Sequence, residues 1–255
     1  YLLMIEAAGE QPDFDLSAIQ FIYSGGAALP ASLLDVLERW CPRVATDYGM
    51  TEMIGTSIYI RPGDTREQKL HTIGRPTGPY RARVADATGE ERPDGEVGEL
   101  QTHGPWQTPG YFRHEEATAE LFTPDGWLRS GDLCRWRLDG FLEMAGRAKE
   151  MFKSGGYNVY PREVEMALED NPKVSMAVVV EIPDPKWSEV GVAFVALTAR
   201  SETTPEELRD ECRARLANYK VPKQVVILDE VPRLSVGKVD RNSLRAKARE
   251  QFAQE

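Results

Sequence analysis

The first part of the chain alternates between short apolar runs and an amphipathic stretch, which predicts strands and a helix. The apolar run at 19–23 ends in the glycine-rich segment 24–28, and Pro30 follows at the position where a helix begins. One face of that helix is apolar at the helical period, and it carries Leu33, Val36, Leu37 and Trp40. The pattern indicates a strand, a glycine loop and a helix in succession.

A second strand is predicted at 44–46, and the polar segment 47–52 is interpreted as a turn at its carboxyl end. Alternating strands and helices are typical of α/β sheets, in which ligands bind at the carboxyl ends of strands. The segment 47–52 is therefore a candidate binding turn. The chain opens at Tyr1 inside an apolar segment and without an initiating Met, which favours a fragment of a longer protein.

From about residue 74 the pattern changes to short strands separated by turn signals. Cys134, Trp136 and Leu138 alternate with two arginines, and the pair at 139–140 then joins this run to the apolar run 141–144 as a hairpin. We interpret this stretch as a small, twisted β subdomain.

Beyond Gly146 the pattern predicts a compact α+β domain. The predicted order is helix, strand, strand, helix, strand and charged terminal helix, at 161–169, 174–182, 190–198, 205–217, 225–228 and from 241 onward. Thr204 and Glu207 form a capping box around Pro205 at the start of the second helix. The chain is thereby divided into the parts 1–73, 74–147 and 148–255.

Composition narrows the function classes. The chain has 255 residues, 41% of them hydrophobic, and a net charge of −10, so it is globular and its overall field repels nucleic acids and anionic membranes. No apolar run approaches the length of a membrane span, and the start has no secretory leader pattern. Three dispersed cysteines with no metal-ligand spacing indicate a reducing compartment, which we interpret as the cytoplasm.

Two segments of the first part can carry chemistry. The glycines at 25 and 26 allow a flat ligand such as a purine to lie against the backbone, or they serve only a tight turn. Tyr48, Thr51 and Glu52 supply a stacking ring, a hydroxyl for a phosphate oxygen and a carboxylate for Mg²⁺, unless 47–52 is an ordinary polar turn.

The later segments are individually ambiguous. Asp132 can accept from ribose hydroxyls or cap backbone amides. Residues 146–150 are interpreted as a linker or as a hinge. The segment 153–161 is either an ordinary loop or a place where the thin chain of a ligand passes close to the backbone. Lys238 in the loop 232–241 is a catalyst or, as is commoner for a lone lysine, a solvated charge.

The order and spacing of these segments resemble the adenylate-forming superfamily, which includes acyl-CoA synthetases, adenylation domains of peptide synthetases and beetle luciferases. The resemblance covers essentially the whole chain and rests on SGGAALP, DYGMTE, GELQTHGP followed by GYF, WLRSGDL, GRAKEMFKSGGYNVYPREVE and PRLSVGKVDR. It implies an α/β and α+β protein: the end of a large α/β N-terminal domain, a small β-barrel-like subdomain and a compact, mobile α+β C-terminal lid domain.

The resemblance also implies roles for residues of the first two parts. Residues of the first glycine loop would line the adenine and acyl crevice, namely Gly25, Gly26 and Ala27. Tyr48 would stack on adenine, Thr51 would touch the phosphate and Glu52 would help to hold Mg²⁺. The rest of that turn would contribute to nucleotide binding through Asp47, Gly49 and Met50. Asp132 would bind the ribose hydroxyls.

In the last part, Arg147 would lie close to the nucleotide and Lys149 matches the hinge about which the C-terminal domain swings between two half-reactions. Lys238 matches the lysine that bridges the substrate carboxylate and the α-phosphate during adenylation. The loop that borders the pantetheine tunnel after the swing is matched by Lys153, Gly155 and Gly156.

The implied function is the C-terminal portion of an ATP-dependent acyl-CoA synthetase. It would activate a fatty or aryl acid as an acyl adenylate, with Mg²⁺, and then form the coenzyme A thioester. A hydrophobic acid is favoured because apolar residues follow the turn, at Met53, Ile54, Ile58 and Tyr59. The family's upstream phosphate loop is absent from these residues, so we expect the chain alone to be inactive or nearly so. Its partners would be the acid, ATP, coenzyme A and, in a homodimer, a second copy.

Two alternatives stay open. One is an acyl-AMP ligase or adenylation domain that loads a carrier protein, although the chain ends soon after Lys238 and shows no carrier domain. The other is a fragment that only binds nucleotide or pairs with a missing N-terminal piece.

Overall fold

The computed structural model describes residue 9 and residues 15–26, 28–199, 201–234 and 237–252. The chain folds as two compact units, the first ending at Met144 and the second beginning at Ala145. The sequence placed the corresponding boundary between 147 and 148. None of the described helices has the length and apolar composition needed to cross a bilayer.

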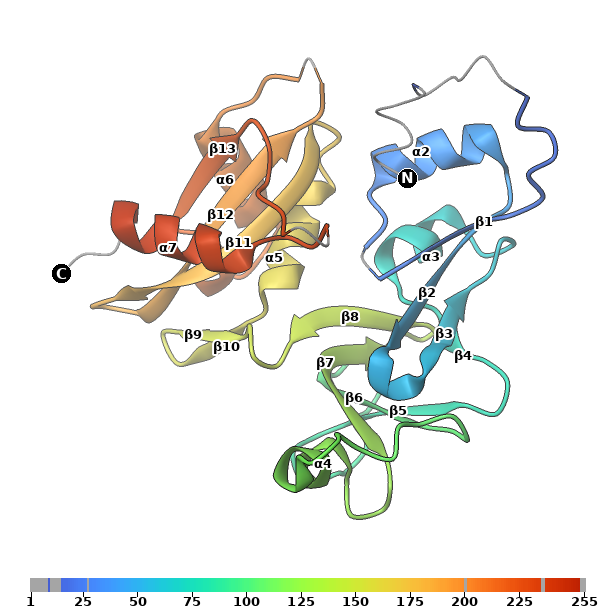
Figure 1. Ribbon diagram of the computed structural model, residues 1–255. Helices are drawn as coiled ribbons and strands as arrows, with labels where there is room; N and C mark the ends of the chain where they lie inside the picture. The colour runs from blue at the N-terminus through green and yellow to red at the C-terminus, as the bar shows by residue number, and fades with distance from the viewer. Residues whose placement is uncertain (1–8, 10–14, 27, 200, 235–236, 253–255) are drawn as a thin grey trace. The chain divides into compact units, whose positions relative to one another are not determined.

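The first unit begins with a four-stranded sheet in the order β1-β2-β3-β4 (Figure 1). Its strands are β1 (Ile22–Gly25), β2 (Val44–Met50), β3 (Gly55–Ile60) and β4 (Arg75–Pro76). β1 and β2 are parallel and are connected through α2 (Ala31–Trp40), as the sequence predicts, whereas β3 and β4 add antiparallel pairs. The 3₁₀ helix η1 (Thr51–Met53) joins β2 to β3, and α3 (Arg66–His71) joins β3 to β4.

Helix α2 begins one residue later than predicted, because Pro30 is its N-cap, and it ends where Cys41 becomes extended. Leu34 and Leu37 are its fully buried residues and pack with Ile22 and Val44 of the strands. The sequence assignment of the apolar face omitted Leu34 and included Leu33 and Trp40, which are only partly buried. The face toward the sheet is therefore rotated slightly from the one assigned.

The second sheet of this region has the order β5-β6-β7-β8. Its strands are β5 (Arg81–Ala85), β6 (Gly98–His103), β7 (Leu128–Trp136) and β8 (Leu142–Arg147), with α4 (Glu115–Leu121) inserted before β7. The expected small β subdomain is thus an open meander with β5 and β8 at its edges. The hairpin at Asp139-Gly140 is present, but Leu138 lies in the turn and is 95% exposed instead of continuing the buried face.

The second unit has a sheet in the order β10-β9-β12-β11, to which β13 adds by pairing with β12. The strands are β9 (Phe152–Ser154), β10 (Tyr157–Val159), β11 (Val174–Asp184), β12 (Ser188–Leu197) and β13 (Gln224–Leu228). The helices are α5 (Pro161–Glu169), α6 (Pro205–Arg215), the 3₁₀ helix η2 (Asn218–Lys220) and α7 (Arg241–Phe252). The capping box of Thr204 and Glu207 is present at α6.

Helices cover both faces of this sheet (Figure 1). Side chains of β11 alternate between two cores: Ala177 and Val179 pack with α5 and α6, whereas Val178 and Val180 pack with α7. Because both faces are covered, β11 is a continuous apolar run and not an alternating one, which explains its sequence.

Candidate nucleotide site

The segment Asp47 to Met50 is the end of strand β2 and not a turn, so that part of the sequence interpretation was wrong. Gly49 pairs with Thr56 and Met50 with Gly55 of β3, after an irregularity at Tyr48. A Cβ atom on Gly49 would lie 2.1 Å from the carbonyl oxygen of Gly55, so only glycine allows this close pairing. The turn itself is η1, at Thr51–Met53.

Gly25 lies opposite Asp47 in the parallel pair of β1 and β2. A Cβ atom on Gly25 would lie 1.7 Å from Asp47 Oδ1, so the missing side chain makes room for this carboxylate. Burial raises the pKa of Asp47, and a hydrogen bond with Thr56 opposes that shift. Gly26 follows with a φ of +83°, a left-handed conformation that favours glycine, and Ala27 lies outside the described residues.

Tyr48 and Asp132 meet although 84 residues separate them. The Tyr48 hydroxyl donates to Asp132 Oδ2 at 2.5 Å, and Asp132, on β7, is 5% exposed. Burial and the Asp132 charge both raise the pKa of Tyr48, so the phenol stays protonated and acts as a donor. The Asp132 backbone N–H donates to Ser130 Oγ at 3.1 Å within β7, where the pairing of β7 with β6 is irregular. The structure thus places an aromatic ring beside a carboxylate.

Glu52 is held in η1 by contacts from the segment after β6. Its Oε1 accepts from the Tyr111 hydroxyl at 2.6 Å, and its backbone oxygen accepts from the Thr108 N–H at 2.8 Å. The hydrogen bond to Glu52 raises the pKa of Tyr111. Thr51, next to Glu52, is exposed. Tyr111 is a site residue that the sequence reasoning missed, although it stands in the GYF motif.

Glu52 fits a magnesium role only with help from a substrate. Within the described ranges, no three His, Cys, Asp or Glu side chains gather to hold a metal ion. Mg²⁺ in phosphoryl-transfer sites keeps several waters and uses one or two carboxylates plus substrate phosphates. A single accessible carboxylate at Glu52 is compatible with that chemistry.

The apolar residues predicted to border an acyl pocket divide into two groups. Met53 and Ile58 are completely buried, in two different cores, and present no surface to a ligand. For these two residues the interpretation was wrong, because the chain uses them to pack its sheets. Ile54 is 65% exposed and Tyr59 is partly buried, so both have surface available.

In the second unit, Lys153, Gly155 and Gly156 lie in a β-hairpin and not in a plain loop. Gly155 and Gly156 form the two-residue connection of β9 and β10, with φ of +59° and +86°, as a primed hairpin turn requires. A Cβ atom on Gly155 would lie 2.6 Å from the Trp187 ring. The Lys153 backbone N–H donates to Glu189 Oε2 at 2.9 Å, and the Lys153 side chain is exposed.

The remaining predicted cations are also exposed and belong to the second unit. Arg147 ends β8, and Lys149 lies in the turn that follows. Lys238 lies on a small hairpin in which Arg233 bridges to Val239 and the Leu234 N–H donates to the Lys238 carbonyl at 2.7 Å. In the first unit, Gly25 pairs with Asp47 and Tyr48 contacts Asp132, whereas Glu52 contacts Tyr111 and Thr108.

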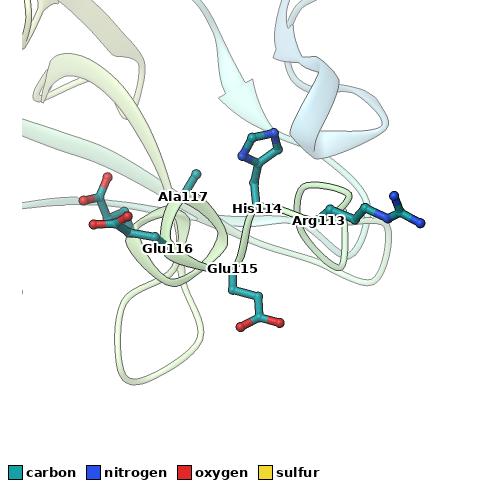
Figure 2. A pocket seen from close by; sticks show the side chains of 6 residues that line it. Arg113, His114, Glu115, Glu116 and Ala117 are labelled. Atoms are coloured by element: carbon teal, nitrogen blue, oxygen red, sulfur yellow. The ribbon is translucent and has the colours of Figure 1, made fainter.

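A solvent-open depression lies beside α4, and none of the predicted site residues lines it. It is lined by exposed side chains, namely Arg113, His114, Glu115, Glu116, Ala117 and Glu120. Figure 2 shows that the labelled side chains point in different directions. A small-molecule site needs convergent polar groups, so we assign this depression no role.

Comparison with known proteins gives the family. The family model for the AMP-binding enzyme matches residues 1–112, and the model for the AMP-binding enzyme C-terminal domain matches residues 163–238. The chain belongs to the AMP-binding enzyme family. The predicted adenylate-forming family is confirmed, and so is the predicted α/β and α+β fold, although the described strands form no closed barrel.

Relatives within the AMP-binding family are named for different activities. The chain is 37% identical to the medium/long-chain-fatty-acid–CoA ligase FadD8 of Mycobacterium tuberculosis, over 96% of this chain and 44% of that protein. It is 37% identical to the sulfoacetate–CoA ligase of Cupriavidus necator, over 95% of this chain and 47% of that protein. The amide bond synthetase McbA of Marinactinospora thermotolerans has a TM-score of 0.86 and 33% identity, over 92% of this chain and 49% of that one. The chain spans about half the length of the relatives it matches.

Proposed function

We propose that this chain is the C-terminal portion of an AMP-forming acid–thiol ligase, which activates a carboxylic acid with ATP and transfers the acyl group to coenzyme A. The observation that carries the proposal is the contact of Tyr48 with Asp132. A nucleoside presents a flat base and two ribose hydroxyls only a few ångströms apart. An aromatic ring held against a buried carboxylate, beside a glycine strand end, is complementary to that arrangement.

In the first half-reaction, a carboxylate oxygen of the acid attacks the α-phosphorus of ATP, and pyrophosphate leaves. Thr51 would contact the phosphate and Glu52 would hold Mg²⁺, which supplies neutralisation of the phosphate charge when bound. Lys238 would bridge the acid and the α-phosphate, where negative charge increases in the transition state. Its exposure on a hairpin supports this role, because the side chain is not committed to the core of its own unit.

In the second half-reaction, the thiolate of coenzyme A attacks the acyl carbon of the adenylate and AMP leaves. In this step the Lys238 side chain must leave the site, and a channel for the thiol must take its place. The β9–β10 hairpin with Gly155 and Gly156 is the candidate wall of that channel. Glycines suit this place because a thin pantetheine chain can approach a backbone that carries no side chains. Lys149, exposed in the turn after β8, is the proposed hinge between the two arrangements.

A hydrophobic acid is the proposed substrate class, supported by the surface that Ile54 and Tyr59 present next to η1. The relatives do not narrow this class, because a fatty-acid ligase and a sulfoacetate ligase are equally identical to the chain.

An acceptor other than coenzyme A is the second candidate, in which the adenylate passes to a carrier protein or an amine. The likeness to a protein named an amide bond synthetase favours testing it, because the same fold serves that activity.

The experiment measures pyrophosphate release over fatty, aryl and short acids, with and without coenzyme A. It compares the chain alone with the chain joined to any coding sequence restored upstream of it.

We expect little release from the chain alone and acid-dependent release, with acyl-CoA formation, from the restored protein. Adenylate formed without thioester would favour the second candidate. No acid-dependent release from the restored protein would contradict both, and nucleotide binding without turnover would leave a binding module.

A further inference from the structure

The first charged residue of α7, Arg241, makes three directed contacts within the second unit. Its Nη2 donates to Glu165 Oε1 at 2.8 Å, its Nη1 donates to the Val179 carbonyl at 3.0 Å, and its Nε pairs with Glu150 Oε2 at 3.4 Å. These partners belong to α5, to β11 and to the turn after β8. One guanidinium therefore joins three segments that are distant in the sequence.

The contacts lie at the open edge of the sheet. β11 is an edge strand, and its outward amides are covered by carboxylates of α5: the Ala177 N–H donates to Glu169 and the Val179 N–H donates to Glu165. The Glu165 side chain is 3% exposed, and its charge is balanced by Arg241 at 2.8 Å and by Arg162 at 3.6 Å. Arg241 is thus anchored to a rigid, buried part of the unit and not to a solvated surface.

Arg241 stands three residues after Lys238. The chain between them is itself fixed, because the Asp240 N–H donates to the Pro232 carbonyl at 2.9 Å and Asp240 Oδ1 accepts from the Ser243 N–H at the start of α7. Three residues reach at most roughly 11 Å even when fully extended. The anchor at Arg241 therefore limits where the Lys238 hairpin can be.

The third partner, Glu150, follows the proposed hinge residue Lys149 directly. The turn it occupies is closed by hydrogen bonds from the amides of Glu150 and Met151 to the Arg147 carbonyl, at 3.0 and 3.1 Å. The contact of Arg241 with Glu150 therefore connects the hinge-side turn to the Lys238 hairpin.

We propose that Arg241 is a positioning residue that holds the Lys238 hairpin and the turn after Lys149 as one rigid arm. The inference rests on the proposed function, in which Lys238 acts only in adenylation. Arg241 touches no substrate. Its role is to keep Lys238 at a fixed place relative to the hinge, so that a rotation at the hinge delivers the lysine reproducibly.

Arg245 provides a matched control. It lies one turn further along α7, its side chain is likewise 24% exposed, and it donates to Glu181 Oε1 at 2.5 Å on β11. Among the described residues, no contact joins Arg245 to Glu165 or to Glu150. Arg241→Gln and Arg245→Gln make the same change of charge on the same helix.

The first test is native-state amide hydrogen exchange on the chain itself. In Arg241→Gln we expect exchange at Leu234, Asp240 and Met151 to rise roughly ten- to a hundred-fold, the effect of losing a charge-assisted hydrogen bond, while the amides of β12 hold their protection. Arg245→Gln should leave these three amides near their wild-type rates. An equal loss of protection in β12, or equal effects of the two variants, would overturn the proposal.

If Arg241→Gln does not fold, Glu150→Gln carries the test, because that side chain is partly exposed and its loss leaves the core intact. It should raise exchange at Met151 and Asp240 together, and a change at neither would refute the coupling. In the restored protein, Arg241→Gln should slow pyrophosphate release far more than thioester formation from a supplied adenylate. A wild type without acid-dependent release would contradict the proposed function alone, because the exchange result does not depend on it.

Discussion

Replacing Tyr48 by Phe removes a single hydroxyl, the one that donates to Asp132 Oδ2 at 2.5 Å. The ring and its packing against the two neighbouring cores are retained. A hydrogen bond to a charged group contributes about 1.5–3 kcal/mol, and Asp132, which is nearly buried, would have one donor fewer. We expect the free energy of unfolding in urea to fall by that amount.

Tyr59→Phe is the matched control on the adjacent strand β3. Its hydroxyl donates to the Thr56 carbonyl at 3.0 Å and lies 2.5 Å from the Thr56 hydroxyl. Both partners are neutral, so the loss of this hydroxyl should cost only about 0.5–1.5 kcal/mol. If Tyr48→Phe proved no more destabilising than Tyr59→Phe, the contact with Asp132 would not be a charge-assisted bond and our reasoning on this site would be refuted.

The same pair predicts an alkaline limit. Burial and the Asp132 charge raise the pKa of Tyr48 above its usual 10.0. The stabilisation from a raised pKa is complete below the unfolded value and is lost as the pH rises above it. Wild type should therefore lose stability above about pH 10 more steeply than Tyr48→Phe. Parallel slopes between pH 9 and 11 would show that this phenol ionises normally in the folded protein.

Three further predictions concern the rest of the chain. Gly49→Ala should lower the free energy of unfolding by about 1–3 kcal/mol, because its Cβ would meet the β3 backbone, whereas Gly63→Ala, whose Cβ meets open space, should be nearly neutral in the same urea titration. Hydrogen bonds from Arg83 and Thr123 lower the pKa of Asp125 to about 2, so the stabilisation from this carboxylate should be complete above about pH 4 and lost between about pH 4 and 2. In Asp125→Asn the free energy of unfolding should therefore fall less steeply over this acid range. An unchanged slope would contradict the assignment. All three cysteines, Cys41, Cys134 and Cys212, are buried, and burial raises the pKa of Cys134 and Cys212. A thiol reagent should therefore label none of them quickly in the native protein and all of them after unfolding. Rapid labelling of the native protein would contradict their burial.

The elements that the sequence predicted well are those whose signals are local. Helix α5 matches its predicted bounds, and α6 begins at its capping box, because caps and periodic apolar positions act within a few residues. β11 was recognised because both of its faces are apolar. A homodimer and a cytoplasmic location stay predictions.

The misassigned elements depend on partners distant in the sequence. Asp47 and Gly49 are unfavourable in strands, and this segment extends β2 because β3 pairs with it. Met53 and Ile58 were assigned to a pocket because their burial in separate cores is a tertiary property. Tyr111 stands in the GYF motif but was assigned no role, since its contact with Glu52 depends on how the chain brings the two residues together. By contrast, Tyr48 and Asp132 were both named as candidates, and the structure brings them together.

The central claim is that Lys238 serves one half-reaction of a two-step ligase. Its most direct test measures both half-reactions of the restored protein in Lys238→Ala: pyrophosphate release from acid and ATP, and thioester formation from a supplied acyl adenylate and coenzyme A. We predict that the first falls about a hundred- to a thousand-fold, as when a transition-state charge contact is lost, while the second stays within a few-fold of wild type. Equal losses in both steps, or no loss in the first, would contradict the account.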